Sequence, residues 1–221
     1  MSLLRKATAN TDITVLSSVF VVATILLIIL SSLVAYNVTL PFDSSVLTWI
    51  NTHANPAFDS FFSSITRLGG VIVITAVTVA LFVYLLFKKA FSKATLVAVG
   101  VGGSAALGFI LKGAFERARP DLWEWIVNET YFSFPSGHAT GSMALALCII
   151  VLLWRTKWRL TAIIAGAIYV LVIGFSRLYL GVHYPTDILG GWLLSTAWVA
   201  LVIIAIYMYV IKNRARTQAA S

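Results

Sequence analysis

Charged side chains are scarce in this chain. Only 11% of its 221 residues are Asp, Glu, Lys or Arg, whereas 60% are hydrophobic. Soluble domains carry roughly 25% charged residues, and a chain this apolar has too little polar surface to face water. This excludes a soluble enzyme or binding domain, and we expect a protein whose solvent is the lipid bilayer.

Cysteine is nearly absent as well. The single cysteine, Cys148, lies inside an apolar run, so no internal disulfide can form and the thiol does not indicate a redox compartment. We expect it to be a small buried apolar side chain. Internal repeats, low-complexity tracts and long linkers are also lacking, so residues 1–221 are expected to form a single membrane domain.

Hydropathy predicts an all-α fold: a polytopic membrane protein with six transmembrane helices. A spanning helix needs about 20 apolar residues, and the second, fourth and fifth segments are short enough to need residues from their flanks. The first segment is too long for the core of a signal peptide, so we expect an uncleaved anchor. The six segments are Ile13–Tyr36, Val71–Phe87, Ala94–Ala114, Ala139–Trp154, Leu160–Phe175 and Ile188–Ile211.

Acidic residues are the rarer charge, with eight against 16 Lys and Arg, which gives a net charge of +8. Most of the basic residues form four clusters, and two spans separate each cluster from the next. All four therefore lie on one face of the membrane, and short basic loops stay cytoplasmic. This predicts cytoplasmic termini and argues against a nucleic-acid-binding surface. The clusters are Arg5/Lys6, Lys88/Lys89/Lys93, Arg155/Lys157/Arg159 and Lys212/Arg214/Arg216.

Three short stretches lie at the opposite, extracytoplasmic ends of the spans. They are KGAFERARP from Lys112 to Pro120, PSGH from Pro135 to His138, and SRLYLGVHYPTD from Ser176 to Asp187. Each stretch follows or precedes a span on the same side of the membrane. We therefore expect four helix ends, and the polar residues that they carry, to meet at one membrane surface.

The cations of these stretches suit a phosphate. Lys112, Arg119 and Arg177 can balance the charge of a phosphate dianion, and arginine binds its oxygens in a bidentate manner. Ser136 and Gly137 precede a predicted helix, whose free N–H groups and dipole attract anions. Each feature alone has an ordinary explanation, such as a snorkelling lysine or a helix cap. Their combination favours a phosphate-binding site.

Two histidines and one carboxylate complete the set. Asp187 is expected in or near the first turn of the last helix, within reach of His183, and a carboxylate bonded to one ring nitrogen leaves the other free to attack. For the pair alone, an interfacial histidine and a helix-terminal acid remain an alternative. His138 has no carboxylate in its stretch, which suits a general acid. A zinc or two-metal site is poorly supplied with ligands.

The chain resembles the type 2 phosphatidic-acid phosphatase superfamily over residues 112–187, residue for residue in a three-part signature. The resemblance implies an active site at the extracytoplasmic helix ends that works without a metal or other cofactor. His183 would be the nucleophile that forms a phosphohistidine, Asp187 would orient it, and His138 would protonate the leaving group. The residues implied to hold the phosphate are Lys112, Arg119, Ser136, Gly137 and Arg177.

The expected function is hydrolysis of a lipid phosphate or diphosphate within the bilayer, with no nucleic-acid partner. Phosphatidylglycerophosphate, undecaprenyl diphosphate and phosphatidate are the candidate substrates. One alternative is a phosphotransferase with the same intermediate, and another is a non-catalytic channel, transporter or receptor-like protein, which the intact motifs disfavour. The segment 121–133, rich in Trp, Tyr and Phe, can be interpreted as a lid at the substrate entry or as a plain aromatic belt.

Overall fold

The computed structural model describes the backbone of residues 3–219 and the side chains of residues 13–212. Within the described backbone the chain forms helices and no strand, which confirms the expected all-α fold. The elements are α1 (Leu3–Ala35), α2 (Leu40–Asn51), α3 (Pro56–Ile65), the 3-10 helix η1 (Thr66–Gly69), α4 (Val71–Phe87), α5 (Phe91–Phe115), α6 (Gly137–Leu153), α7 (Arg159–Tyr179) and α8 (Pro185–Ala219).

The six predicted spans correspond to helices α1, α4, α5, α6, α7 and α8. Among the described residues, five stretches are long and apolar enough to cross a membrane, and α6 is a shorter apolar helix of 17 residues. The helix boundaries differ from the predicted ones, most clearly where α7 extends to Tyr179 and where α3 and η1 lead directly into α4 to give a stretch of 32 residues. α6 can be short because α4, α5, α7 and α8 pack around it.

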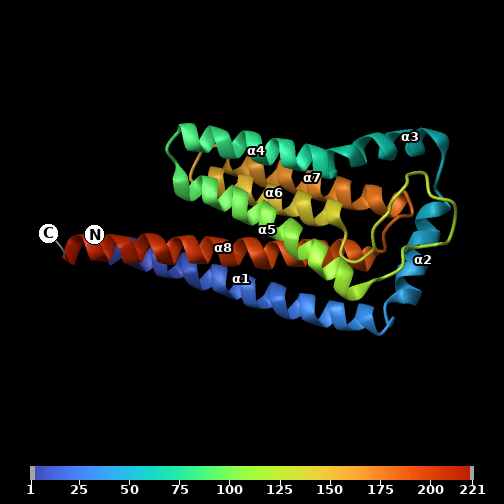
Figure 1. Cartoon of the computed structure of the whole chain (residues 1–221), viewed down its shortest axis with the longest axis horizontal. Coiled ribbons are helices and arrows are strands. Elements are labelled where there is room, and N and C mark those ends of the chain that lie inside the picture. The colour runs from blue at the N-terminus through green and yellow to red at the C-terminus, as the bar shows by residue number, and fades with distance from the viewer. Residues whose placement is uncertain (1–2, 220–221) are drawn as a thin grey trace.

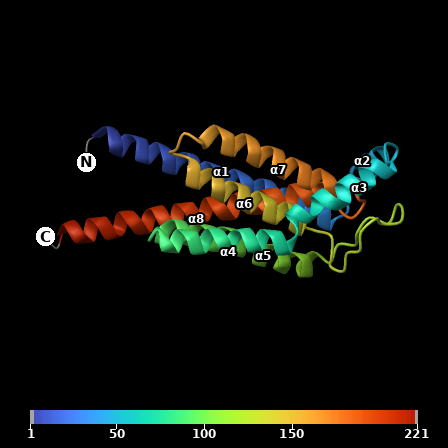
Figure 2. The same ribbon diagram turned by 90° about the horizontal axis from the view of Figure 1, so that it is seen from above.

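The long helices run along one axis, and the shorter α2 crosses the end of the bundle (Figure 1). α1 packs chiefly against α8, while α6 contacts α5, α7 and α8 and forms the centre of the bundle. α1 begins and α8 ends at one end of the bundle, whereas α2 and the long connection between α5 and α6 lie at the other end. Figure 2 places α3 at this same end. The three motifs border these elements, so the fold collects them at one end.

Close packing of helices fixes the framework of that end. An added Cβ on Gly103 of α5 would lie 2.3 Å from the indole nitrogen of Trp198 in α8, and this nitrogen donates a hydrogen bond to the Val99 carbonyl at 2.8 Å. Gly100 approaches Cys148 of α6 in the same way. Cys148 is fully buried, as its sequence context predicts. Small residues therefore let α5, α6 and α8 approach closely.

The outer surface of the bundle is apolar and exposed, as in Val22, Ile28 and Val79. Lipid tails are the solvent that suits these exposed apolar side chains. The buried polar residues lie elsewhere: Asp43, Ser133, Arg177, His183 and Asp187 have almost no accessible surface. They gather at the end of the bundle that carries the motifs.

Candidate active site

His183 and Asp187 lie side by side at the start of α8. The Nδ1 atom of His183 is 3.3 Å from Oδ2 of Asp187, and both side chains are buried. Pro185 begins α8, and Asp187 falls in its first turn. Proline is tolerated at this position because its missing N–H has no intrahelical partner there. The structure thus brings together the two residues that the sequence predicts to act as a pair.

The other ring nitrogen of His183 faces an arginine. Its Nε2 atom is 3.2 Å from Nη1 of Arg119. Because the Asp187 carboxylate is the natural acceptor for a proton on Nδ1, Nε2 carries the lone pair. Burial lowers the pKa of His183 well below its usual range, and the positive charge of Arg119 lowers it further. The imidazole is therefore neutral at pH 7, with a lone pair directed at Arg119.

Asp187 has every oxygen engaged. Oδ2 accepts hydrogen bonds from the Ser133 hydroxyl and, at 2.8 Å, from the Tyr184 backbone N–H. Oδ1 accepts a hydrogen bond from Nη1 of Arg117 at 2.5 Å. Sequence reasoning missed Arg117 and Ser133 as site residues, although both lie between or inside the motifs. Their roles depend on contacts between distant segments, which spacing along the chain does not reveal.

Arg119 and Arg177 share a carboxylate. Nη2 of Arg119 is 3.2 Å from Oε2 of Glu129, and Nη2 of Arg177 donates to Oε1 of the same side chain. Arg177 also donates to Thr66 of η1 at 3.0 Å, while its Nε is buried with no hydrogen-bond partner among the described residues. Two guanidinium groups therefore converge on one anion, and one donor stays unused. Glu129 was also missed by sequence reasoning.

Lys112 is bound to the segment that precedes α6. Its Nζ donates to the carbonyl oxygens of Phe132 at 2.5 Å and Ser133 at 3.2 Å. It comes from the last turn of α5, and the backbone turns away after it at Glu116, where φ is 44°. The ammonium group therefore fixes the segment that carries Ser133 and contributes positive charge beside the His183–Asp187 pair.

The N-terminus of α6 forms a further side of the site. Ser136 caps the helix by accepting a hydrogen bond from the Ala139 N–H at 3.4 Å, and its own N–H donates to the Asp187 carbonyl at 3.0 Å. Gly137 is exposed, with open space where a Cβ would lie. His138 is partly exposed and lies against Gly69 and Gly70. Ser136 thus joins α6 to α8, and Gly137 leaves the helix terminus accessible.

The aromatic segment 121–133 packs against the third motif. Gly181 adopts a φ of +71°, and a Cβ there would lie 2.6 Å from Nε1 of Trp123. Trp125 donates to the Pro120 carbonyl at 2.8 Å, and the Tyr131 carbonyl accepts from Nε of Arg119 at 2.7 Å. The segment therefore forms a wall of the site and supplies ligands for its cations. It does more than the plain aromatic belt that was one interpretation of the sequence.

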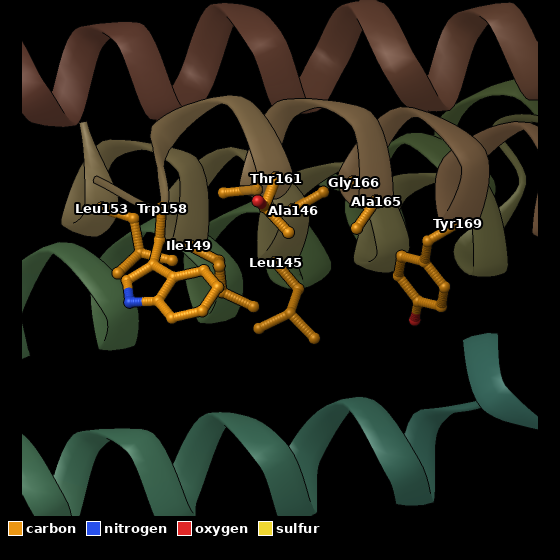
Figure 3. Close-up of a pocket in the computed structure, with 10 residues that line it drawn as sticks. Leu145, Ala146, Ile149, Leu153, Trp158, Thr161, Ala165, Gly166 and Tyr169 are labelled. Carbon is orange, nitrogen blue, oxygen red and sulfur yellow. The ribbon is translucent and has the colours of Figure 1, made fainter. Parts of the chain in front are cut away.

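An apolar groove of about 360 Å³ lies between α6 and α7 (Figure 3). Leu145, Ile149 and Trp158 line it, and α4 passes across from them in the picture. Tyr169, also at the groove, donates its hydroxyl to the Leu68 carbonyl at 2.8 Å. No cation lines this groove, so it is separate from the anion-binding site. Among the described residues, no group of three or more His, Cys, Asp or Glu is arranged to hold a metal ion.

The fold and the site define an integral membrane protein with a buried His–Asp pair beside two anion-binding arginines. The chain belongs to the PAP2 superfamily, whose family model matches residues 93–211. Phosphatidylglycerophosphatase B of Bacillus subtilis is 34% identical over 146 residues, which cover 63% of this chain and 71% of that protein. Undecaprenyl-diphosphatase of Sulfolobus acidocaldarius is 31% identical over 134 residues, which cover 55% of this chain and 59% of that protein.

A solved structure agrees with these relatives. The crystal structure of a transmembrane PAP2-type phosphatidylglycerolphosphate phosphatase from Bacillus subtilis matches with a TM-score of 0.76 and 26% sequence identity. The match covers 83% of this chain and 93% of that chain. The family and the multi-pass helical architecture expected from the sequence are thereby confirmed, and a membrane lipid phosphatase is the function that the relatives' names support.

Proposed function

We propose that this protein hydrolyses a lipid phosphate monoester or diphosphate through a phosphohistidine on His183. One observation carries the proposal: Nε2 of His183 lies 3.2 Å from Arg119, one of two arginines that already hold an anionic group. A neutral imidazole whose other nitrogen bonds a carboxylate is an activated nucleophile. Its lone pair is aimed at the place where an anion binds.

Phosphate binding replaces Glu129. A phosphate dianion carries more charge than the carboxylate and offers oxygens to Arg119 and Arg177 together. The unused Nε of Arg177 provides an additional donor. The accessible helix terminus at Gly137 adds backbone N–H groups, and Lys112 adds positive charge. These residues correspond to the phosphate ligands expected from the sequence, with Ser136 acting through its position at the helix cap.

The reaction then proceeds in two displacements. Nε2 of His183 attacks phosphorus, an N–P bond forms, and the P–O bond to the leaving group breaks while His138 donates a proton to the leaving oxygen. His138 next removes a proton from water, whose oxygen attacks phosphorus and breaks the N–P bond. Inorganic phosphate and free His183 result. The cations of Lys112, Arg119 and Arg177 stabilise the negative charge on the phosphoryl oxygens in both steps, so the scheme requires no divalent metal.

The substrate class follows from the position of the site. The catalytic residues lie at the ends of helices that suit a bilayer, so a lipid can present its headgroup to them without leaving the membrane. Phosphatidylglycerophosphate and undecaprenyl diphosphate are the candidates that the relatives' names add weight to. The basic clusters at Lys88 and Arg155 lie at the opposite ends of the helices. Because short basic loops stay in the cytoplasm, these clusters favour a site on the extracytoplasmic face and termini in the cytoplasm.

Trapping of the phosphoenzyme tests this function. With a lipid substrate labelled in its phosphate, the wild-type protein should yield an alkali-stable, acid-labile adduct after rapid quenching. His183→Ala should yield none and lose at least about 10³-fold in turnover, whereas His53→Ala, in the exposed connection after α2, should behave as wild type. Activity should survive EDTA. Substantial turnover by His183→Ala, or loss on chelation that Mg²⁺ restores, would refute the scheme.

A further inference from the structure

Arg117 bridges two buried carboxylates. Its Nη1 lies 2.5 Å from Oδ1 of Asp187, and its Nη2 lies 2.7 Å from Oδ2 of Asp43. The side chain of Arg117 is 8% exposed, and the two carboxylates are completely buried. Thr186 closes the network, because it accepts from Arg117 at 2.8 Å and donates from its hydroxyl to Asp43 at 2.7 Å. None of these contacts involves the anion held by Arg119 and Arg177.

We propose that Arg117 and Asp43 are positioning residues: Arg117 keeps Asp187 ionised, Asp43 holds the guanidinium of Arg117 in place, and together they orient Asp187 toward His183 and set the pH range of catalysis. This inference rests on the proposed role of His183 as nucleophile and deepens it. It assigns a role to α2, which carries Asp43 in its first turn and lies outside the three sequence motifs.

Arg117 balances the charge of the buried Asp187 carboxylate. A fully buried carboxylate is strongly unfavourable unless a cation and hydrogen bonds compensate it. Among the described residues, Arg117 is the cation in direct contact with Asp187, because Arg119 and Arg177 bind Glu129. Asp43 engages the second donor of the same guanidinium. The shared cation binds only Oδ1 of Asp187, so Oδ2 faces Nδ1 of His183 at 3.3 Å together with its other two donors.

Several contacts hold Arg117 and Asp43 rigidly in place. The Arg117 carbonyl accepts a hydrogen bond from the Ser133 N–H at 2.8 Å, and its guanidinium lies 4.2 Å from the ring centroid of Tyr184. Asp43 also accepts from the Thr186 N–H at 3.1 Å, which ties α2 to the start of α8. Three segments far apart in the sequence are thus joined at the carboxylate. Such support holds a catalytic pair within the narrow geometry that reaction requires.

The pH dependence of catalysis is sensitive to this network because several charged groups surround His183. Burial and the neighbouring cations hold the pKa of His183 below its usual range, so its protonation responds to any change in the ionisation of Asp187. The groups that face His183 are Arg119, Arg177, Lys112, His138, Ser133 and Asp187. The groups that face Asp187 are Arg117, Ser133, Tyr184 and, through Arg117 and Thr186, Asp43.

The test measures the acid limb of kcat/KM in purified variants of the full chain, with one substrate throughout so that its own ionisation cancels. In Arg117→Gln, Asp187 loses its cation and faces Asp43, so it takes up a proton and releases Nδ1 of His183. We expect kcat to fall roughly 10²-fold and the acid limb to move up by about one pH unit or more. Arg117→Lys keeps the charge and should keep the acid limb in its wild-type position.

A second substitution makes the test independent of folding losses. Asp43→Asn introduced into Arg117→Gln removes the carboxylate that repels Asp187, so the acid limb should return toward the wild-type position. Because Arg117 and Asp43 are in direct contact, the double variant can recover stability even if the pair only supports the fold, but a purely structural role does not move the acid limb. Asp59→Asn is the matched control: it removes the negative charge of the α3 carboxylate that accepts a 2.7 Å hydrogen bond from Tyr179, away from the pair, and should leave the profile unchanged.

The outcomes are distinct. Acid limbs that coincide in wild type, Arg117→Gln and the double variant would overturn the positioning role, even if kcat changes. Asp43→Asn alone keeps the Arg117–Asp187 ion pair, so its acid limb should stay nearer the wild-type position than that of Arg117→Gln, and an equal upward shift in both single variants would overturn the assignment of the compensating charge to Arg117. Failure of the proposed function itself appears elsewhere, as a wild-type protein that forms no phosphohistidine. A phosphohistidine together with unmoved acid limbs therefore contradicts only the role of Arg117 and Asp43.

Discussion

Glu129 holds the place where the proposed reaction needs a phosphate. Its two oxygens bind Arg119 and Arg177, which are the guanidinium groups nearest to the proposed phosphate site. In the proposed reaction a phosphate competes with this carboxylate for the two arginines, and its higher charge favours the exchange.

Substitution of Glu129 should strengthen anion binding. Glu129→Gln removes the negative charge but keeps the size of the side chain, so both arginines become available. We expect orthovanadate and inorganic phosphate to inhibit at about tenfold lower concentrations, which corresponds to about 1.4 kcal/mol. Inhibition constants measured in detergent against a lipid phosphate provide the readout.

The control for this substitution is Glu124→Gln, because Glu124 is an exposed acid in the same segment. It should leave both inhibition constants unchanged. Weaker inhibition of Glu129→Gln by vanadate would show that Glu129 organises the arginines for the substrate and does not compete with it.

At the residue scale, the proposed reacting pair can be predicted from the sequence more readily than the residues that hold it in place. His183 and Asp187 are four positions apart, so a turn followed by a helix brings them together whatever the rest of the chain does. Arg117, Asp43 and Glu129 come from segments that only the tertiary fold places beside the pair. A pattern of spacing carries no information on such contacts. These residues were accessible to sequence reasoning only as unexplained charges on the same side of the membrane as the motifs.

At the element scale, hydropathy located the helices because the bilayer imposes a minimum apolar length on each. It did not show that α3 and η1 continue into α4. Thr66–Gly70 interrupts the apolar pattern there, and the two glycines provide close packing against Ile173 and His138. The segment 121–133 was equally ambiguous, since aromatic residues suit either an interface or a site wall. Only its contacts with Arg119, Lys112 and Gly181 distinguish the two.

The packing of this segment on Gly181 predicts a strong effect of a single methyl group. Gly181→Ala places a side chain at a φ of +71° and within 2.6 Å of Trp123. We expect a loss of about 1–3 kcal/mol in stability, together with reduced activity as the segment that carries Glu129 and Ser133 is displaced. Thermal unfolding in detergent and turnover measure the two effects.

Two variants delimit this prediction. Gly102→Ala, where an added Cβ on α5 meets nothing within 4 Å, should be neutral or stabilise by about 0.5–1 kcal/mol. Trp123→Ala combined with Gly181→Ala relieves the contact but not the backbone strain, so it should recover only part of the loss. A stable and fully active Gly181→Ala would show that the segment adapts freely and does not position the site.

At the scale of the whole molecule, the clusters of basic residues and the proposed reacting residues lie at opposite ends of the bundle. The turns after α4 and α6 carry Lys88, Lys89, Arg155 and Lys157, while the reacting residues gather beyond α5 and α7. The number of helices between the motifs is what brings them to one end. Sequence reasoning could establish this alternation, because it depends only on the order of spans. Which end faces the cytoplasm depends on the positive-inside rule alone, and that dependence makes the orientation worth testing directly.

Cysteine accessibility provides that test. In a Cys148→Ala background, single cysteines at Asn128 and Thr156 are exposed and lie near opposite ends of the bundle. An impermeant maleimide added to intact cells or spheroplasts should label Asn128→Cys and leave Thr156→Cys unlabelled until the membrane is permeabilised. The reverse pattern would place the His183–Asp187 pair in the cytoplasm. The substrates would then be lipid phosphates of the inner leaflet, because a headgroup can reach these residues only from the leaflet that borders them.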